Sequence, residues 1–347
     1  MTISKIKLAD IEANQTVEMQ LLIRRKDLAQ SRNGKDYLKL KLGDSSGEIS
    51  AFLWDDAARA DAGLQEGDCV HIKGRTQVFN GNLQLTLNFV ELWQGPIDPR
   101  NFLPQSDKHI PTMQRDLLQI ITDIRDPWLK RLAQAFFVKD QAFAEAFAIA
   151  PAAKAMHHAW LGGLLEHTLS VARLALQVTP LYPQINADLV LTGALLHDIG
   201  KVKELVYERN LDYSTAGRLL GHVMIGVQMI QEKAKTIKNF PDATLLQVEH
   251  LILSHHGEYE YGSPKRPKTL EAILLNFIDD LDAKIVAVSS HLEAGKTKDS
   301  DWSDFHRLFG RAFYAAPLPE SPEPAAAPTN PVAESGSAIP SEIPKLF

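Results

Sequence analysis

The spacing of hydrophobic residues changes near residue 110 of this chain, and that change limits the folds that it can adopt. Up to about residue 93, apolar and polar residues alternate with a period of two, which is typical of β-strands with one buried face. From Thr112 to about Tyr314, apolar residues recur every three or four positions, as they do on amphipathic helices. The chain therefore combines an all-β part with an all-α part. Strands are expected at Thr16–Ile23, Asp36–Leu42, Glu48–Trp54, Cys69–Arg75 and Asn82–Val90.

Turn-forming sequences separate these five strands. Asn33-Gly34, residues 44–47 and Asn80-Gly81 are typical of hairpin turns. A short helix is expected over about Asp55–Gly63, between the third and fourth strands. Five short strands with one such helix indicate a small barrel, and the OB-fold has this number of strands.

Two further segments complete the domain organisation. Residues 94–111 carry repeated prolines and have the composition of a linker. Residues 315–347 contain eight prolines among 33 residues, and we expect them to form a disordered tail because they have too little apolar surface to offset chain entropy. With residues 1–93 as the barrel and residues 112–314 as an all-α domain, a multidomain protein is predicted.

Composition excludes several classes of protein. No apolar run approaches the ~18 residues that a membrane span needs, and the N-terminus lacks the apolar block of a secretory signal. The single cysteine, Cys69, excludes an intramolecular disulfide and fits a reducing compartment, so we expect a cytoplasmic protein with no membrane partner. The net charge of −6 provides no overall basic field, so a nucleic-acid partner requires a local basic patch.

One outward face of the expected barrel combines aromatic and basic side chains. Tyr37 and Lys39 alternate with leucines in the second strand, and Phe52 and Trp54 alternate with core residues in the third. Phe79 lies at the tip of the last hairpin. Single-strand-binding proteins stack bases on aromatic side chains and follow the phosphates with cations. This face is therefore predicted to bind single-stranded nucleic acid; the alternative is that its aromatic residues pack against the second domain or under a loop.

Further cations are expected beside that face. Arg24, Arg25 and Lys26 are placed at the end of the first strand, and Arg32 and Lys35 in the loop that follows. Because residues 1–93 contain 12 basic and 13 acidic residues, any electrostatic attraction is local.

Histidine is concentrated in the helical part. Eight of the 12 histidines lie between His157 and His256, and several interrupt apolar helical stretches. Imidazole and carboxylate groups are costly to bury unless they are paired or bind a metal, and mixed sets of them suit Mn²⁺, Fe²⁺, Co²⁺ or Zn²⁺. A divalent metal site is predicted; the alternative is a set of separately hydrogen-bonded core histidines. The candidates are His167, His197, Asp198, His222, His255, His256 and Asp279, with Asp280 beside the last.

Two local patterns resemble known families. The strings GEISAFLWDD and GDCVHIKGRTQVFNGNLQL resemble OB-fold modules of the replication protein A type, which place aromatic residues at the positions of Trp54 and Phe79. The strings GGLLEHTLSVA, ALLHDIGK and LSHHGEYEYGSP resemble the HD-domain metal phosphohydrolases. This second resemblance implies one or two ions. It implies His167, His197, Asp198 and Asp279 as ligands of one ion, with Asp280 as the alternative to Asp279, and His222, His255 and His256 for a second.

Catalytic roles are expected for Asp198 and Lys201. Asp198 can bridge two metals. Lys201 lies one helical turn beyond His197 and is predicted to bind the scissile phosphate; the alternative is a solvated cation at a helix end. His157 and His158 either line the substrate entrance, where His158 would contact nucleic acid, or cap the helix.

An OB module followed by an HD domain resembles the YhaM-type 3′–5′ exoribonuclease family over about residues 1–314. The resemblance implies hydrolysis of single-stranded RNA, with single-stranded DNA as a further substrate class, from the 3′ end to nucleoside 5′-monophosphates with Mn²⁺ or a similar ion. Two alternatives stay open: an HD phosphodiesterase acting on a small nucleotide, and a non-catalytic single-strand-binding adaptor. A homo-oligomer is compatible with the sequence, which sets no number of subunits.

Overall fold

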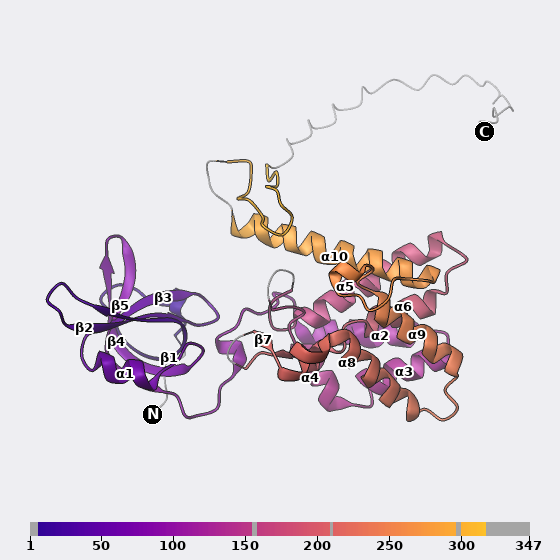
Figure 1. Ribbon diagram of the computed structural model, residues 1–347, viewed down its shortest axis with the longest axis horizontal. Helices are drawn as coiled ribbons and strands as arrows, with labels where there is room; N and C mark the ends of the chain where they lie inside the picture. The colour runs from indigo at the N-terminus through magenta and orange to yellow at the C-terminus, as the bar shows by residue number, and fades with distance from the viewer. Residues whose placement is uncertain (1–5, 155–157, 209–210, 296–299, 317–347) are drawn as a thin grey trace, which may run out of the picture. The chain divides into compact units, whose positions relative to one another are not determined.

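The computed structural model describes residues 6–154, 158–208, 211–295 and 300–316. The chain separates into two compact units, Met1–Ala294 and Gly295–Phe347. The first unit contains a five-stranded barrel followed by the helices α2 to α10 (Figure 1). Of the predicted disordered tail, residues 317–347 lie outside the described residues.

The predicted OB-fold is confirmed. The five strands form a closed barrel in the order β1-β2-β3-β5-β4. Neighbouring strands are antiparallel except β3 and β5, which are parallel. Helix α1 (Ala57–Gly63) follows β3, within the range expected for a helix. The strands are β1 (Thr16–Gln30), β2 (Asp36–Gly43), β3 (Glu48–Leu53), β4 (Cys69–Phe79) and β5 (Asn82–Leu92).

Strand β1 is longer than the predicted Thr16–Ile23, and Arg24 to Lys26 lie in its middle rather than at its end. The first half of β1 pairs with β4 and the second half with β2, with an irregularity between Ile23 and Arg25. Leu21, Leu22 and Ile23 are all buried because the strand faces two apolar clusters here. The predicted end of the strand at Ile23 is wrong, because β1 continues to Gln30. The run of three buried residues breaks the period of two at the point where the strand was expected to end.

The alternation within β2 and β3 determines which side chains reach the barrel core. Leu38, Leu40 and Leu42 are buried, as are Ile49, Ala51 and Leu53 on the neighbouring strand. The intervening side chains therefore point outward, as predicted. At the far hairpin, Asn80 and Gly81 both have positive φ, 49° and 78°, which is the backbone of the expected two-residue turn.

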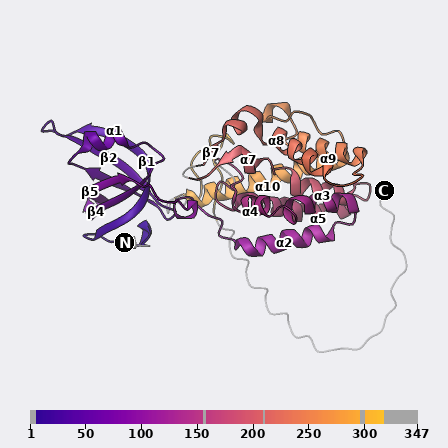
Figure 2. The same ribbon diagram turned by 90° about the horizontal axis from the view of Figure 1, so that it is seen from below.

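The helices form the predicted α-helical domain around one apolar core. Helix α5 contacts α2, α4, α6 and α10, and Figure 2 shows α5 and α10 between α2 on one side and α8 and α9 on the other. The helices are α2 (Ile110–Asp123), α3 (Pro127–Phe137), α4 (Gln141–Ile149), α5 (Gly163–Val178), α6 (Ala187–Leu196), α7 (Lys201–Glu204), α8 (Thr215–Lys235), α9 (Asp242–Ser254) and α10 (Leu270–Ala294).

Three details differ from the sequence pattern. Strands β6 (Leu205–Val206) and β7 (Asp212–Tyr213) form a small sheet inside the helical domain, and they are too short to show a periodicity. Helix α2 begins within the segment predicted as linker, with Pro111 in its first turn, where a missing N–H costs nothing. The first compact unit ends with α10 rather than near residue 314.

The second unit is small in the part that the structure describes. Residues 300–316 are joined by two bridges, Trp302 with Tyr314 and His306 with Arg311. Among the described residues, no helix is long and apolar enough to cross a membrane.

Candidate metal centre and nucleic-acid interface

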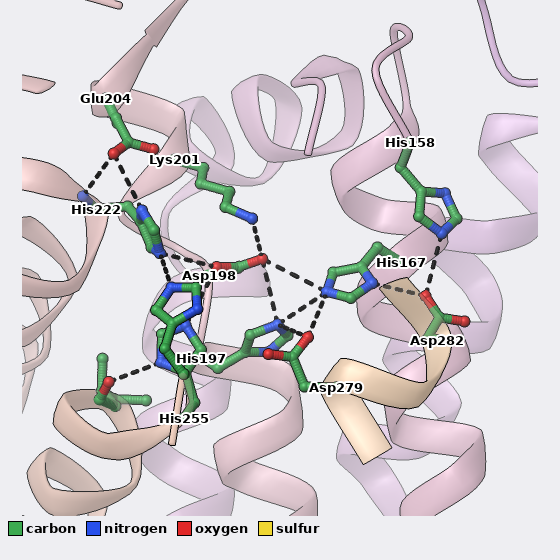
Figure 3. Close-up of polar contacts among 12 residues, drawn as sticks. His158, His167, His197, Asp198, Lys201, Glu204, His222, His255, Asp279 and Asp282 are labelled. Carbon is green, nitrogen blue, oxygen red and sulfur yellow. Dashed lines mark hydrogen bonds and ion pairs between the residues drawn. The ribbon is translucent and has the colours of Figure 1, made fainter. Parts of the chain in front are cut away.

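The predicted ligands meet where several helices end or bend (Figure 3). His197 directly follows α6, and Asp198 lies in the turn that leads to α7. His167 comes from α5, His222 from α8, and Asp279 from α10. His255 and His256 directly follow α9. Residues that are far apart in the sequence are thus brought into one polar cluster within an apolar core.

Two glycines permit this arrangement. A Cβ on Gly200 would lie 2.0 Å from the backbone oxygen of His222, so the turn after Asp198 approaches α8 as only glycine allows. Gly221 has a φ of 72° and interrupts the helical geometry of α8 immediately before His222. The two positions bring His222 next to the Asp198 turn.

Asp198 lies at the centre of the cluster, and its two carboxylate oxygens face different histidines. Oδ2 is 3.5 Å from His167 Nε2 and 3.3 Å from His197 Nε2. Oδ1 is 3.5 Å from His222 Nε2 and 3.7 Å from His255 Nε2. A carboxylate in this position can bridge two cations.

The side chains around Asp198 form two groups with the spacing of metal ligands. In one group the ligand atoms of His167, His197 and Asp279 lie within 4.8 Å of one another. In the other group, His222, His255 and His256 have the same spacing. Asp279, rather than its neighbour Asp280, joins the first group; Asp280 forms an exposed ion pair with Lys284.

The residues present fit a cation. His197 Nδ1 donates to Ala194 O at 2.9 Å, and His255 Nδ1 donates to Ile252 O at 2.7 Å, so each ring turns its Nε2 toward Asp198. Asp198 Oδ1 and His255 Nε2 are buried and have no hydrogen-bond partner among the described residues. Buried polar atoms are normally satisfied, and a divalent ion would satisfy both.

Protonation favours metal ligation at four of the expected ligands, His255, His256, Asp198 and Asp279. Burial lowers the pKa of His255 well below its usual value and lowers the pKa of His256 to about 4, so both are neutral near pH 7. Burial opposes the charged forms of Asp198 and Asp279. The attraction of Lys201 and His197 outweighs it at Asp198, and His197 together with the hydrogen bond from His167 outweighs it at Asp279, so both pKa values lie below the usual range. These four groups are in the protonation states in which imidazole and carboxylate bind metals. His167 differs: burial opposes its charge, but its hydrogen bonds to Asp279 and Asp282 prevail and raise its pKa to about 9, so an ion bound there would displace a proton.

Lys201 is buried rather than solvated. Its Nζ donates to Asp198 Oδ2 at 2.6 Å. Burial opposes its charge, but the attraction of Asp198 prevails and raises the pKa of Lys201. The solvated helix-end alternative is therefore wrong, and a fixed positive charge lies beside the ligand cluster.

His158 does not line an entrance. Its side chain is 2% exposed, and its Nε2 lies 3.1 Å from Asp282 Oδ2. Because it is buried behind His167, it is not accessible to a nucleic-acid strand, which corrects the sequence-based expectation. His157 lies outside the described residues.

Sequence reasoning missed two carboxylates behind the ligands. Asp282 Oδ2 accepts from His167 Nδ1 at 2.7 Å, and Glu204 Oε1 accepts from His222 Nδ1 at 3.0 Å. Asp282 follows Asp279 by three residues, a spacing that places both on one helix face and was available as a signal. No sequence motif marks Glu204.

The barrel carries a compact aromatic group on its outward face. The rings of Tyr37 and Trp54 stack with centroids 4.7 Å apart, and Phe52 lies 6.2 Å from Tyr37. Trp54 is 40% exposed. Lys39 pairs in register with Phe52, is exposed and makes no ion pair with the described residues. Phe79 is 61% exposed at its hairpin tip, and no ring contact joins it to the stack within the described chain.

Two of the predicted surface cations are used inside the protein instead. Arg24 Nη2 donates to Phe102 O at 2.6 Å. Lys26 Nζ donates to the carbonyls of Asp61 and Leu64 and pairs with the Asp61 carboxylate at 2.8 Å. Their position in the middle of β1 explains this change, and the basic part of the face is smaller than expected.

Comparison with known families matches both halves of the chain. The HD domain model matches residues 164–284, and the model described as an OB-fold nucleic acid binding domain matches residues 19–93. A model described as a putative helicase matches residues 102–184.

Two relatives that align over most of both chains come from Listeria. A protein of Listeria welshimeri named 3′-5′ exoribonuclease YhaM is 35% identical over 316 residues, which cover 89% of this chain and 97% of that protein. A Listeria innocua protein of the same name is 34% identical with the same coverage. Among solved structures, the second OB-fold domain of replication protein A from Methanococcus maripaludis aligns with 16% identity and a TM-score of 0.22, covering 27% of this chain and 98% of that domain.

Proposed function

This chain belongs to the YhaM family of 3′-5′ exoribonucleases, and from that premise we propose that it is a metal-dependent enzyme that degrades single-stranded RNA from the 3′ end to nucleoside 5′-monophosphates. Single-stranded DNA is a second substrate class within the proposal. The single cysteine supports a reducing, cytoplasmic setting.

The position of Asp198 carries the proposal. One carboxylate oxygen faces His167 and His197, and the other faces His222 and His255. A bridging carboxylate between two histidine groups is a donor set suited to a pair of divalent ions. Such a pair suits hydrolysis of a phosphodiester, and an adaptor that only binds strands has no need of it.

The metal would be held by His167, His197, Asp198 and Asp279 at one position and by Asp198, His222, His255 and His256 at the other. We propose Mn²⁺ as the bound ion. Fe²⁺, Co²⁺ and Zn²⁺ are alternatives, because mixed imidazole and carboxylate donors suit all four. When bound, divalent ions would supply Lewis acidity that activates water and stabilises charge on the phosphate.

The protein's own residues provide the rest of the chemistry. Lys201 holds a positive charge next to Asp198, where it can attract a phosphate oxygen as negative charge develops. The apolar core around the cluster lowers the local dielectric constant, and this strengthens the electrostatic interactions of these charged groups. Asp198 and Lys201 are therefore the proposed catalytic residues.

The barrel would hold the RNA strand. The Tyr37–Trp54 stack offers a flat apolar surface for bases, Lys39 offers a charge for a phosphate, and Phe79 offers a second ring. This supports single-stranded rather than duplex substrates, because bases in a duplex are not free to stack on protein.

The test uses 5′-labelled single-stranded RNA with metal-stripped protein, with and without Mn²⁺, resolved on a sequencing gel. We expect Mn²⁺-dependent shortening from the 3′ end. The Asp198→Ala variant should lose cleavage while it still shifts the RNA on a native gel. Asp280→Asn, which removes an exposed carboxylate outside the cluster, should cleave normally.

Other outcomes separate the alternatives. An intact strand that still shifts on a native gel would overturn the proposal in favour of a binding adaptor. Neither cleavage nor a shift would point to a small nucleotide substrate. Full Mn²⁺-dependent activity in Asp198→Ala would refute the assignment of the site.

A further inference from the structure

We propose that Asp282 and Glu204 are positioning residues, each fixing one metal-facing histidine, so that the two ions depend on two separate outer carboxylates. The inference rests on the proposed function because it requires ions at the Asp198 cluster. It concerns two residues that make no direct contact with the expected ions.

The first pair is Asp282 and His167. Asp282 Oδ2 accepts from His167 Nδ1 at 2.7 Å, and both side chains are buried. With Nδ1 used in this way, His167 presents Nε2 to Asp279 at 3.1 Å and to Asp198 at 3.5 Å. A carboxylate on the far side of a ligating imidazole fixes its tautomer and orientation and makes it a stronger donor.

Asp282 is itself held rigidly. Its Oδ1 accepts from Ser170 Oγ on α5, and its Oδ2 is also within 3.1 Å of His158 Nε2. His158 has a φ of 49°, a left-handed conformation that is unusual for a residue other than glycine. A Cβ on Gly163 would lie 2.1 Å from His158 O, so the neighbouring backbone is packed against this turn. Several features thus converge on one carboxylate that lies behind the expected ligands.

The second pair is Glu204 and His222. Glu204 Oε1 accepts from both the backbone N–H and Nδ1 of His222, at 2.9 and 3.0 Å. The kink at Gly221 interrupts α8 just before His222, and Glu204 accepts the N–H that follows the kink. His222 Nε2 then lies 3.5 Å from Asp198 Oδ1 and 3.0 Å from His256 Nε2.

The remaining anchored histidines use neutral acceptors. His197 and His255 donate Nδ1 to the carbonyls of Ala194 and Ile252. Each ligand group thus contains one histidine held by a backbone carbonyl and one held by a carboxylate. Removing an outer carboxylate should therefore weaken the ion on its own side of Asp198.

The experiment measures Mn²⁺ binding to the metal-stripped full-length protein by titration calorimetry, with electron paramagnetic resonance to detect coupling between two ions. The wild type should bind two coupled ions. Asp282→Asn and Glu204→Gln should each weaken one ion about 10- to 100-fold, which is the usual effect of losing an outer-shell partner. Asp280→Asn, on the same helix as Asp282, should bind like the wild type.

A second set of variants, made in a protein that already carries His256→Ala, shows which ion each carboxylate supports. In a His256→Ala protein, which retains the His167 group, Asp282→Asn should still weaken the remaining ion, and Glu204→Gln should have no further effect. If Asp282→Asn does not fold, Ser170→Ala removes one donor to the same carboxylate and should produce a smaller loss at the same ion. The unfolding temperature of each metal-free variant shows whether a loss of binding reflects a loss of structure.

The failure of this inference differs from failure of the proposed function. No Mn²⁺ binding by the wild type would remove the proposed function itself. A single bound ion, or two ions with unchanged affinity in both variants, would overturn the inference alone. A third ion that is lost in Asp282→Asn would also overturn it, because His158, His167 and Asp282 would then be ligands themselves.

Discussion

The ring of Tyr37 stacks on the indole of Trp54, with centroids 4.7 Å apart and planes inclined by 25°. Tyr37 belongs to β2, and Trp54 directly follows β3, so the pairing of the two strands assembles the stack before any ligand binds. A preassembled aromatic surface loses little conformational entropy when a base stacks on it.

We predict that Trp54→Ala weakens binding of single-stranded RNA. Loss of one stacking platform costs about 1–3 kcal/mol, or about 5- to 150-fold in Kd. Hydrolysis of a dinucleotide should be nearly unchanged, because a short substrate does not need the barrel. Fluorescence anisotropy with a labelled RNA measures the binding. Phe89→Ala, which removes an outward ring that packs on His71 instead, is the control and should have a smaller effect.

Lys39 is predicted to contribute a phosphate contact. For single strands, each phosphate neutralised contributes about −0.7 to the slope of log K against log salt concentration. Lys39→Gln should therefore make the slope shallower by about 0.7. Lys35→Gln is the matched control, because Lys35 is already paired with Asp55 at 2.8 Å. An unchanged slope in Lys39→Gln would place this side chain outside the RNA path.

Lys201→Gln is predicted to lower kcat more than it raises KM. Losing one fixed charge that stabilises the transition state typically costs about 10²–10³ in kcat. Steady-state cleavage of RNA measures both constants, and the unfolding temperature shows whether the buried pair with Asp198 is needed for stability. Lys203→Gln removes an exposed cation from the same helix and should behave like the wild type. A wild-type kcat in Lys201→Gln would exclude the proposed role.

Asp140 is predicted to stabilise the helical domain in a pH-dependent way. It caps α4 by accepting from Phe143 N at 3.0 Å, and its other oxygen pairs with Lys233 at 2.7 Å. Asp140→Ala should lower the free energy of unfolding by about 1 kcal/mol at pH 7, which corresponds to a decrease of about 2–4 °C in Tm for a domain of this size.

The pH dependence has a definite sign. The hydrogen bond from Lys233 lowers the pKa of Asp140 below its usual value of 3.8. The stabilisation is therefore complete above that value and is lost as the pH falls through the lower pKa of the folded state. Thermal unfolding between pH 7 and pH 3 should show the deficit of Asp140→Ala shrinking at the acid end. Lys233→Met keeps the helix cap, so it should lower the free energy of unfolding at pH 7 by less than Asp140→Ala does.

Much of the fold follows from local spacing. The period of two in β2 and β3, the turn at Asn80-Gly81 and the helical period along α5 each depend on residues that are close in sequence. Local steric and hydrophobic preferences act over the same range, so these elements could be predicted. The end of β1 could not, because its middle faces two apolar clusters that distant segments create.

The site divides in the same way. The sequence by itself determined which residue types gather near the metal centre, because histidines and aspartates are costly to bury within apolar helices unless they are paired or bind a metal. Only the tertiary structure decided which of them face one another. Asp279 rather than Asp280 points at His167 because adjacent residues on a helix are rotated by about 100°. Asp282, Glu204 and the burial of His158 depend on the packing of helices that are distant in the sequence, and no local pattern records that packing.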